Sequence, residues 1–220
     1  MITPNLDILR QFQSSPESRE LILGASCGVA DGLPIVWASR LAGRALPERL
    51  AGSDLALILP RVAAADGLPV LLLGGNPGVA QLAAARLEKL HPGIEVTCHC
   101  PPFGFEDDGH ELDRIRLALR RAQPGLVLVG LPFPKQERLI RLLRAEFPGI
   151  WFAGVGFSLS FVAGDQQRAP VVLQRCGLEW LHRLCHEPRR LAKRYLILGL
   201  PFAARLLAWA VAQRVRGLVR

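Results

Sequence analysis

The sequence predicts an α/β fold in which helices flank a parallel sheet and a basic, amphipathic helical segment follows at the C-terminus. The first observation is that short apolar runs alternate with segments of helical periodicity, with glycine where the apolar runs end. The second is the charge distribution, because the whole net charge of +8 lies in residues 175–220. We therefore expect a neutral α/β domain at residues 1–174 and a cationic appendage at residues 175–220.

Four apolar runs have the length and composition of buried strands. They occupy residues 69–74, 94–98, 125–130 and 151–156. Other segments repeat apolar residues at helical spacing, as at Leu112, Ile115 and Leu119, where arginines occupy the opposite face. The predicted helices cover residues 7–13, 33–41, 55–65, 79–90, 111–121 and 135–146. Strands that alternate with helices in this way form parallel sheets covered on both faces.

The composition is that of a globular, cytoplasmic protein. Half of the 220 residues are hydrophobic, which argues against disorder and permits a substantial core. The chain opens without the basic start and apolar core of a signal peptide. The five cysteines are odd in number and lack metal-ligand spacing, and His182 and His186 have no third ligand near them in the sequence. We therefore expect reduced thiols and no metal site.

The appendage combines ten basic residues with two acidic ones and with large apolar side chains. Its first uncharged run, residues 195–204, is shorter than the roughly 20 residues that a spanning helix needs, and Pro201 and Arg205 interrupt any longer run. We therefore expect a helix that lies in the headgroup region of an anionic membrane. Self-packing as an ordinary amphipathic helix is the alternative. Few aromatic side chains accompany the charge, which disfavours nucleic acid as a partner.

Candidate ligand-binding residues follow three of the predicted strands, because ligands of open α/β sheets bind beyond the carboxyl ends of the strands. After the first strand, the glycine-rich turn at residues 74–80 lets the backbone approach an anion at a helix N-terminus. After the third, two prolines stiffen a turn and place Lys135 and Gln136 at a helix start; a rigid turn with solvated charges is the alternative. After the fourth, residues 154–156 lead to Arg168. The sequence has no GxGxxG dinucleotide motif.

Polar residues also occur in the otherwise apolar N-terminal part. Asp31 precedes a glycine, a setting more typical of a turn residue than of a base, and Arg49 follows in a short polar segment. Thr3-Pro-Asn5 is typical of the cap of a following helix.

Short motifs lie in a fixed order along the chain, and the set is far more specific than any one of them. They are Thr3-Pro-Asn5, Ala30-Asp-Gly32, Glu48-Arg49 with Gly52, Asn76-Pro-Gly-Val-Ala80, Pro101-Pro-Phe-Gly-Phe105, Pro134-Lys-Gln-Glu137, Arg168-Ala-Pro170, and Gly177-Leu-Glu-Trp180 with Arg183-Leu184 and Glu187-Pro188. In this set, over nearly its whole length, the chain resembles the WecG/TagA/CpsF glycosyltransferases of bacterial surface-polysaccharide assembly.

The resemblance implies a Rossmann-like fold and an inverting, metal-independent transfer of a sugar from a UDP-sugar to a polyprenyl-diphosphate-linked saccharide. It implies no cofactor, and a C-terminal appendage that docks on the inner face of the cell membrane. Family members use N-acetylmannosamine, its uronic acid or other hexose derivatives, in exopolysaccharide, capsule or teichoic-acid-type assembly. A homo-oligomer is compatible with the resemblance.

The resemblance also assigns roles to residues. Asp31 is the expected general base, Arg49 offsets charge on the departing diphosphate, and Gln136 takes part in catalysis. The residues expected to bind substrate are Thr3, Asn5, Gly75, Asn76, Gly78, Lys135, Glu137, Arg168, Arg183 and Arg190. Of these, Arg183 and Arg190 are expected to complete the diphosphate site from the appendage.

Three departures from the family pattern bear on activity. Relatives carry a further strand and helix before the Thr-Pro-Asn motif, so we expect this chain to lack them. Ser160 occupies a position where Asp is common, and Pro34 one where Gly is usual. A non-catalytic scaffold that binds nucleotide-sugar or lipid is therefore the alternative function. A nucleotide-dependent oxidoreductase or methyltransferase is disfavoured by the missing dinucleotide motif.

Overall fold

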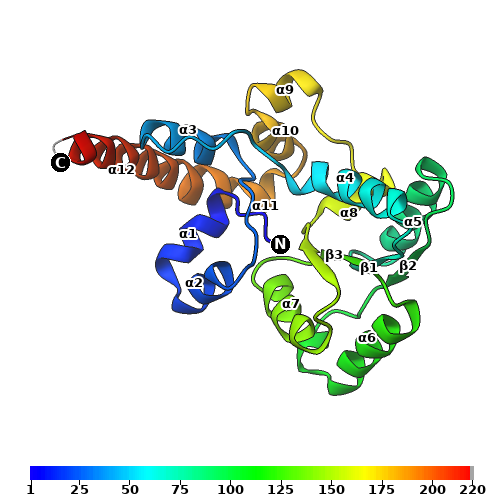
Figure 1. Ribbon diagram of the computed structural model, residues 1–220. Helices are drawn as coiled ribbons and strands as arrows, with labels where there is room; N and C mark the ends of the chain where they lie inside the picture. Colours follow the sequence, from blue (N-terminus) through cyan, green and yellow to red (C-terminus); the bar gives the residue numbers. More distant parts are fainter. Residues whose placement is uncertain (219–220) are drawn as a thin grey trace. The chain divides into compact units, whose positions relative to one another are not determined.

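The computed structural model of the protein describes residues 1–218, whose packing forms two compact units (Figure 1). The first unit comprises Met1–Ile2, Gly24–Cys27 and Gly52–Gln167. The second comprises Thr3–Leu23, Gly28–Ala51 and the chain from Arg168 onward. Both units are discontinuous in sequence, so packing groups the N-terminal helices with the C-terminal segment. The functional division into residues 1–174 and 175–220 stays a prediction.

The first unit contains a four-stranded parallel sheet with the strand order β2-β1-β3-β4. Its strands are β1 (Val70–Gly74), β2 (Val96–His99), β3 (Leu126–Gly130) and β4 (Trp151–Gly154). The chain adds β2 on one side of β1 and β3 on the other, so the strand order reverses between β1 and β3. At the carboxyl end of this pair Gly74 lies opposite Gly130. This is the topological switch point at which open α/β sheets bind their ligands.

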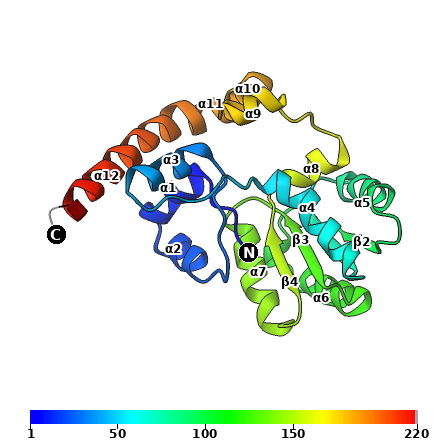
Figure 2. The ribbon, with the colours of Figure 1, turned by 45° about the horizontal axis from the view of Figure 1, so that its top comes forward.

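Helices cover both faces of this sheet (Figure 2). One face has α4 (Gly52–Ala65), α5 (Val79–Leu90) and α8 (Ser158–Ala163). The other has α6 (Gly109–Ala122), which follows the 3₁₀ turn η1 (Phe105–Asp107), and α7 (Lys135–Glu146). Leu72 and Leu128 belong to the first core and Leu71 and Val127 to the second, because alternate residues of a strand point to opposite faces. The predicted fold class, a parallel sheet flanked by helices, is confirmed.

The first two residues lie along the edge strand β4. The N-terminal ammonium of Met1 donates to the Phe152 carbonyl at 2.6 Å, and the Gly154 N–H donates to the Met1 carbonyl at 3.1 Å. The Ile2 N–H donates to the Cys27 carbonyl at 2.9 Å. Burial lowers the pKa of the Met1 ammonium. These contacts pair backbone groups that an edge strand would otherwise leave open.

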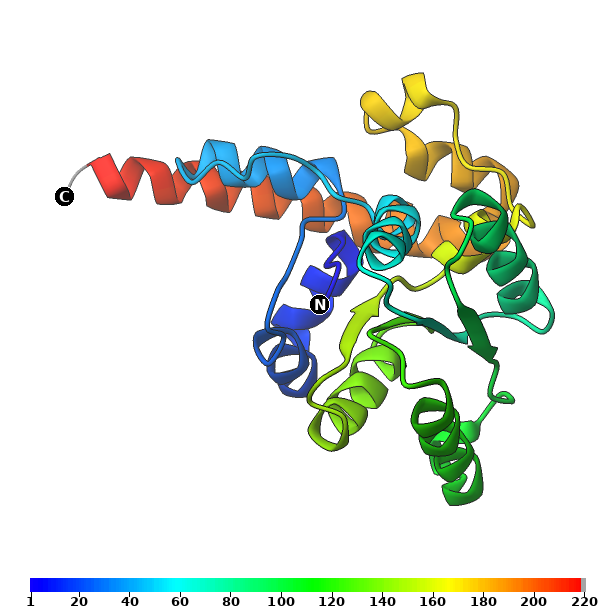
Figure 3. The same ribbon diagram turned by 45° about the vertical axis from the view of Figure 1, so that its right-hand side comes forward.

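The second unit is helical. Its elements are α1 (Leu6–Ser14), α2 (Pro16–Leu23), α3 (Leu33–Leu41), α9 (Val171–Arg175), α10 (Glu179–His186), α11 (Pro188–Ala192), the π-helix η2 (Lys193–Gly199) and α12 (Leu200–Leu218). The long helix α12 lies along α3, as Figure 3 shows, and α1 contacts η2. The C-terminal segment is therefore attached to two of the N-terminal helices of its own unit, α1 and α3.

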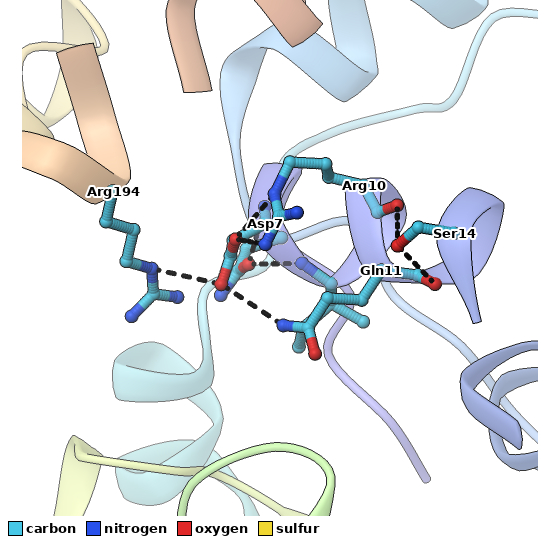
Figure 4. Close-up of polar contacts among 7 residues, drawn as sticks. Asp7, Arg10, Gln11, Ser14 and Arg194 are labelled. Atoms are coloured by element: carbon cyan, nitrogen blue, oxygen red, sulfur yellow. Dashed lines mark hydrogen bonds and ion pairs between the residues drawn. The ribbon is translucent and has the colours of Figure 1, made fainter. Parts of the chain in front are cut away.

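Asp7 attaches α1 to η2 (Figure 4). Its carboxylate accepts hydrogen bonds from Arg10 at 2.9 Å and Gln11 at 3.3 Å, and it forms an ion pair with Arg194 at 3.2 Å. Asn5 caps the same helix, because its Oδ1 accepts two first-turn N–H groups at 3.1 Å. The predicted cap at the start of α1 is confirmed.

The C-terminal helix is continuous from Pro188 to Gly217 and passes through Pro201. The π-helix before the proline is the reason: the Leu200 N–H donates to the Tyr195 carbonyl, five residues back. This wider turn relieves the clash that a proline ring makes with the preceding turn of a regular α-helix. An 18-residue window has a mean hydropathy of 1.7 and is 17% buried, so length and composition alone permit a membrane crossing. Core helices of soluble proteins also meet that criterion.

Most predicted elements are confirmed, and α3, α5 and α7 have the predicted ends. The α-helices α2, α8 and α9 have no counterpart in the sequence prediction. The start of α2 does carry a signal, because Pro16 is its first residue and the Ser15 Oγ accepts the Ser18 N–H at 3.2 Å. By contrast, α8 has only 6 residues, too few to show a helical period.

Candidate functional site

The turn after β1 brings main-chain N–H groups to the switch point of the first unit. Gly74 has a φ of 98°, and a Cβ there would lie 3.0 Å from the Gly130 carbonyl oxygen, so only glycine fits. The Gly75 N–H donates to the same oxygen at 2.9 Å. Gly78, with a φ of 81°, is the N-cap of α5 and supplies no side-chain cap. The predicted Gly75-Asn76-Gly78 turn therefore lies at the switch point, beside a helix N-terminus that favours anions.

The Gln136 side chain links the start of α7 to the turn after β4. Its Oε1 accepts the Gly156 N–H at 2.8 Å, and its Nε2 donates to the Glu137 Oε1 at 2.8 Å. Gly154 leaves room for this amide, because a Cβ there would lie 2.2 Å from Nε2. The Gln136 residue is 3% exposed. Both ends of the amide thus bind within the protein, and the predicted catalytic role of Gln136 stays a prediction.

Glu137 places a buried carboxylate at the same helix start. Burial raises its pKa, and the hydrogen bond from Gln136 acts in the opposite direction. Among the residues that the structure describes, its Oε2 has no hydrogen-bond partner. A buried carboxylate with one unsatisfied oxygen favours its protonated form. Its predicted role in substrate binding stays a prediction.

Lys135 is an accessible cation at the start of α7. It pairs with Glu106, and the hydrogen bond from Lys135 lowers the pKa of the Glu106 carboxyl. The Lys135 Nζ also lies 4.9 Å from the ring centroid of Phe103, which is fully exposed. Cys100 is a neighbour that sequence reasoning missed, since its thiol donates to the Gly75 carbonyl at 3.1 Å and burial raises its pKa. The Cys-His-Cys alternation indicated a strand, but it carried no signal for the turn that the strand meets.

Backbone hydrogen bonds bring three predicted motifs together in the second unit. The Asp31 N–H donates to the Pro4 carbonyl at 2.9 Å, and the Leu50 N–H donates to the Ala30 carbonyl at 3.0 Å. Thr3, next to Pro4, is buried. The Thr-Pro-Asn motif, the predicted base and the segment that carries the predicted arginine thus lie side by side, although they are far apart in the sequence.

Glu179, the first residue of α10, joins two of the predicted arginines. Its Oε2 lies 3.1 Å from the Arg49 Nη1, and its Oε1 lies 3.4 Å from the Arg168 Nε. The three side chains are 16–20% exposed. Sequence reasoning missed Glu179 as a site residue, although it belongs to the quoted Gly-Leu-Glu-Trp motif.

The two appendage arginines follow Glu179 along the chain. Arg183 lies one helical turn further on α10, and Arg190 lies on α11, where it donates to Glu187 at 2.5 Å. That hydrogen bond is the main cause that lowers the pKa of Glu187. The predicted part of both arginines in a diphosphate site stays a prediction.

The two residues that depart from the family pattern fit their local structure. Ser160 is buried in α8, and Pro34 follows the first residue of α3, where the backbone N–H has no partner within the helix. Within residues 1–218, no group of three His, Cys, Asp or Glu side chains is arranged to hold a metal ion. Metal independence of the reaction stays a prediction.

A doubly wound parallel sheet with a glycine turn at its switch point defines a class of α/β proteins that bind anionic ligands there. The model of the glycosyl transferase WecG/TagA/CpsF family matches residues 1–216. A relative from Staphylococcus aureus (strain MW2), N-acetylglucosaminyldiphosphoundecaprenol N-acetyl-beta-D-mannosaminyltransferase, is 31% identical over 193 residues, which cover 88% of this chain and 74% of the relative. The chain therefore belongs to the WecG/TagA/CpsF family and is a glycosyltransferase. The predicted resemblance is confirmed.

The Gly154→Ala variant tests the clamp at Gln136. The new methyl group would displace the amide, so we expect a loss of about 1–3 kcal/mol in the free energy of unfolding and a weaker glycosyl transfer. Urea denaturation and a transfer assay measure both quantities. Gly149→Ala is the matched control, since nothing lies within 4 Å of a Cβ there. Equal behaviour of the two variants would contradict the clamp.

The Glu137→Gln variant tests the raised pKa of Glu137. Above the ordinary pKa of a carboxyl group the folded protein still holds a proton that the unfolded chain has lost. The free energy of unfolding therefore falls as the pH rises through the raised folded-state pKa. As the pH rises from the ordinary carboxyl pKa through the raised folded-state pKa, the wild type should lose more stability than Glu137→Gln, as measured by urea denaturation. Glu95→Gln, at an exposed carboxylate, should follow the wild type; parallel curves for all three proteins would contradict the prediction.

Proposed function

We propose that the protein transfers a hexose derivative, such as N-acetylmannosamine or its uronic acid, from a UDP-sugar to a polyprenyl-diphosphate-linked saccharide. The reaction is inverting and metal-independent, and it serves exopolysaccharide, capsule or teichoic-acid-type assembly. The observation that carries the proposal is the 31% identical relative, whose name specifies N-acetylmannosaminyl transfer onto an N-acetylglucosaminyl-diphospho-undecaprenol. The lipid-linked acceptor comes to this chain from that similarity.

Residues at the switch point of the first unit support a nucleotide-sugar donor. The turn at Gly75, Asn76 and Gly78 leads into α5, and the N-terminus of a helix suits a phosphate group. Lys135, which pairs with Glu106, adds a partly exposed ammonium group at the start of α7. In this proposal Gln136 acts by fixing the Gly156 main chain, and Glu137 orients Gln136 in turn.

Asp31 is the proposed general base. It removes the proton from the acceptor hydroxyl as that oxygen bonds to the anomeric carbon, while the bond between this carbon and the UDP oxygen breaks. UDP leaves with the bonding electron pair, and a single displacement inverts the anomeric centre. Arg49 offsets the negative charge that grows on the diphosphate. Arg49 lies near the base in the chain's fold, because the N–H of the next residue, Leu50, donates to the carbonyl of Ala30, which precedes Asp31.

The C-terminal segment is proposed to hold the enzyme on the inner face of the cell membrane as a peripheral protein. Several large apolar side chains of α12 are exposed, namely Trp209, Val211 and Val215. Most of the basic residues in the C-terminal segment are arginines. Such a contact is stabilised by apolar side chains that insert between the lipid headgroups, and by arginines that bind anionic lipids. A lipid-linked acceptor is reached only at the bilayer, so this attachment suits the proposed reaction.

The Asp31→Asn variant tests the reaction. With a UDP-sugar and a short-chain polyprenyl-diphosphate-linked acceptor, transfer should fall at least about 100-fold, because the amide cannot take the proton. Binding of UDP, measured by calorimetry, should remain. Asp66→Asn, at an exposed residue after α4, should transfer at the wild-type rate. Full activity of Asp31→Asn would refute the role of the base, and a wild-type protein that binds but never transfers would support the scaffold alternative.

Charge reversal tests the membrane contact. Arg189→Glu combined with Lys193→Glu should weaken co-sedimentation with phosphatidylglycerol vesicles at least tenfold, since each basic residue near an anionic leaflet contributes about 1 kcal/mol. Both residues are exposed, and Arg61→Glu on α4 is the exposed control. Unchanged vesicle binding would contradict the proposal. Binding that resists both charge reversal and high salt would instead support a spanning helix.

A further inference from the structure

Three charged side chains from distant parts of the sequence meet in the second unit. Arg49 lies in the segment between α3 and α4, Arg168 precedes α9, and Glu179 begins α10. Each oxygen of the Glu179 carboxylate faces one guanidinium, at 3.1 Å for Arg49 and 3.4 Å for Arg168. We call these three residues the arginine-pair cluster.

The carboxylate makes the approach of the two arginines favourable. Two guanidiniums that are each mostly removed from water repel one another, and the bridging carboxylate offsets this repulsion. The carboxylate therefore holds two guanidinium groups beside one another, one on each of its oxygens. Guanidinium groups are planar and bind phosphate oxygens in a bidentate way, so two of them held close together suit a ligand with two phosphate groups.

We propose that Glu179 is a positioning residue that presents Arg49 and Arg168 together to the diphosphate of the sugar nucleotide. The inference rests on the proposed function, and it extends that function to a residue with no role in the chemistry itself. Glu179 keeps its bonds to both guanidiniums when the diphosphate binds, and it does not touch the substrate. The two arginines contact adjacent phosphate groups and counter the charge that develops as UDP leaves.

The position of Glu179 also gives the C-terminal segment a part in substrate binding. Glu179 is the first residue of α10, from which the chain continues through α11 and η2 into α12. Arg49 lies next to Leu50, whose N–H bonds to the residue before Asp31. Glu179 thus connects the segment that carries the net charge to the segment that holds the proposed base.

The full-length Glu179→Gln variant tests the inference through two probes, UDP and inorganic diphosphate, with binding measured by calorimetry. We expect the Kd of both to rise about tenfold, and the KM for the UDP-sugar to rise with it, because the guanidiniums are no longer held as a pair. Glu179→Asp, which keeps the carboxylate, should recover part of the affinity. Glu20→Gln, at an exposed carboxylate of the same unit, is the control and should match the wild type.

A mutant cycle separates positioning from a merely structural role. If Glu179 acts through the two arginines, then adding Glu179→Gln to a protein that already carries Arg49→Ala and Arg168→Ala should not weaken UDP binding further. Additive losses, or a loss of stability with unchanged Kd values, would overturn the inference. Tighter binding by Glu179→Gln would also overturn it, because it would show that the carboxylate competes with the diphosphate.

The proposed reaction and the positioning role of Glu179 can be refuted separately. A wild-type protein that binds UDP and inorganic diphosphate but transfers no sugar would refute the proposed reaction, while the Kd values still decide the role of Glu179. A wild-type protein that binds neither probe would overturn the inference itself.

Discussion

The pairing of β1 with β3 at their carboxyl ends is the constraint on which the first unit depends. Gly74 and Gly130 lie opposite each other, and each lacks room for a side chain. A Cβ on Gly74 would lie 3.0 Å from the Gly130 carbonyl oxygen, and a Cβ on Gly130 would lie 2.5 Å from Leu159. This close approach lets the Gly75 N–H reach the Gly130 carbonyl and fixes the turn that leads into α5. The reversal of strand order at the same place makes this turn the natural position for an anionic ligand.

The polar residues around that turn bind mainly to the protein itself. Gln136 uses both ends of its amide, on the Gly156 main chain and on Glu137, and the absence of a side chain at Gly154 makes this possible. A side chain whose donors and acceptors are satisfied internally keeps its position at little further entropic cost. The structure thus supports a role for Gln136 as a support of the Gly156 turn, beyond the direct participation that the family resemblance implies.

The second unit obtains its organisation from contacts of high sequence separation. Main-chain bonds join the Thr-Pro-Asn, Ala-Asp-Gly and Glu-Arg segments, Asp7 attaches α1 to η2, and Glu179 gathers Arg49 and Arg168. In each case a charged or polar group of the N-terminal part pairs with the C-terminal segment or with another motif. The C-terminal segment therefore also helps to organise this unit, since its Arg194 pairs with Asp7 and its Glu179 pairs with Arg49.

Local patterns in the sequence determined the fold class, the presence of most elements and the cap at Asn5, because periodicity and capping depend on neighbouring residues. Motif order determined the family and the list of candidate residues. Only the tertiary structure decided which of them meet: Glu179 between two arginines, Cys100 at the glycine turn, and Gln136 bonded to Gly156. It also decided that Pro201 continues the helix, because the π-turn before it changes the hydrogen-bond spacing. Contacts between residues far apart in a chain depend on packing and register, which no local pattern specifies.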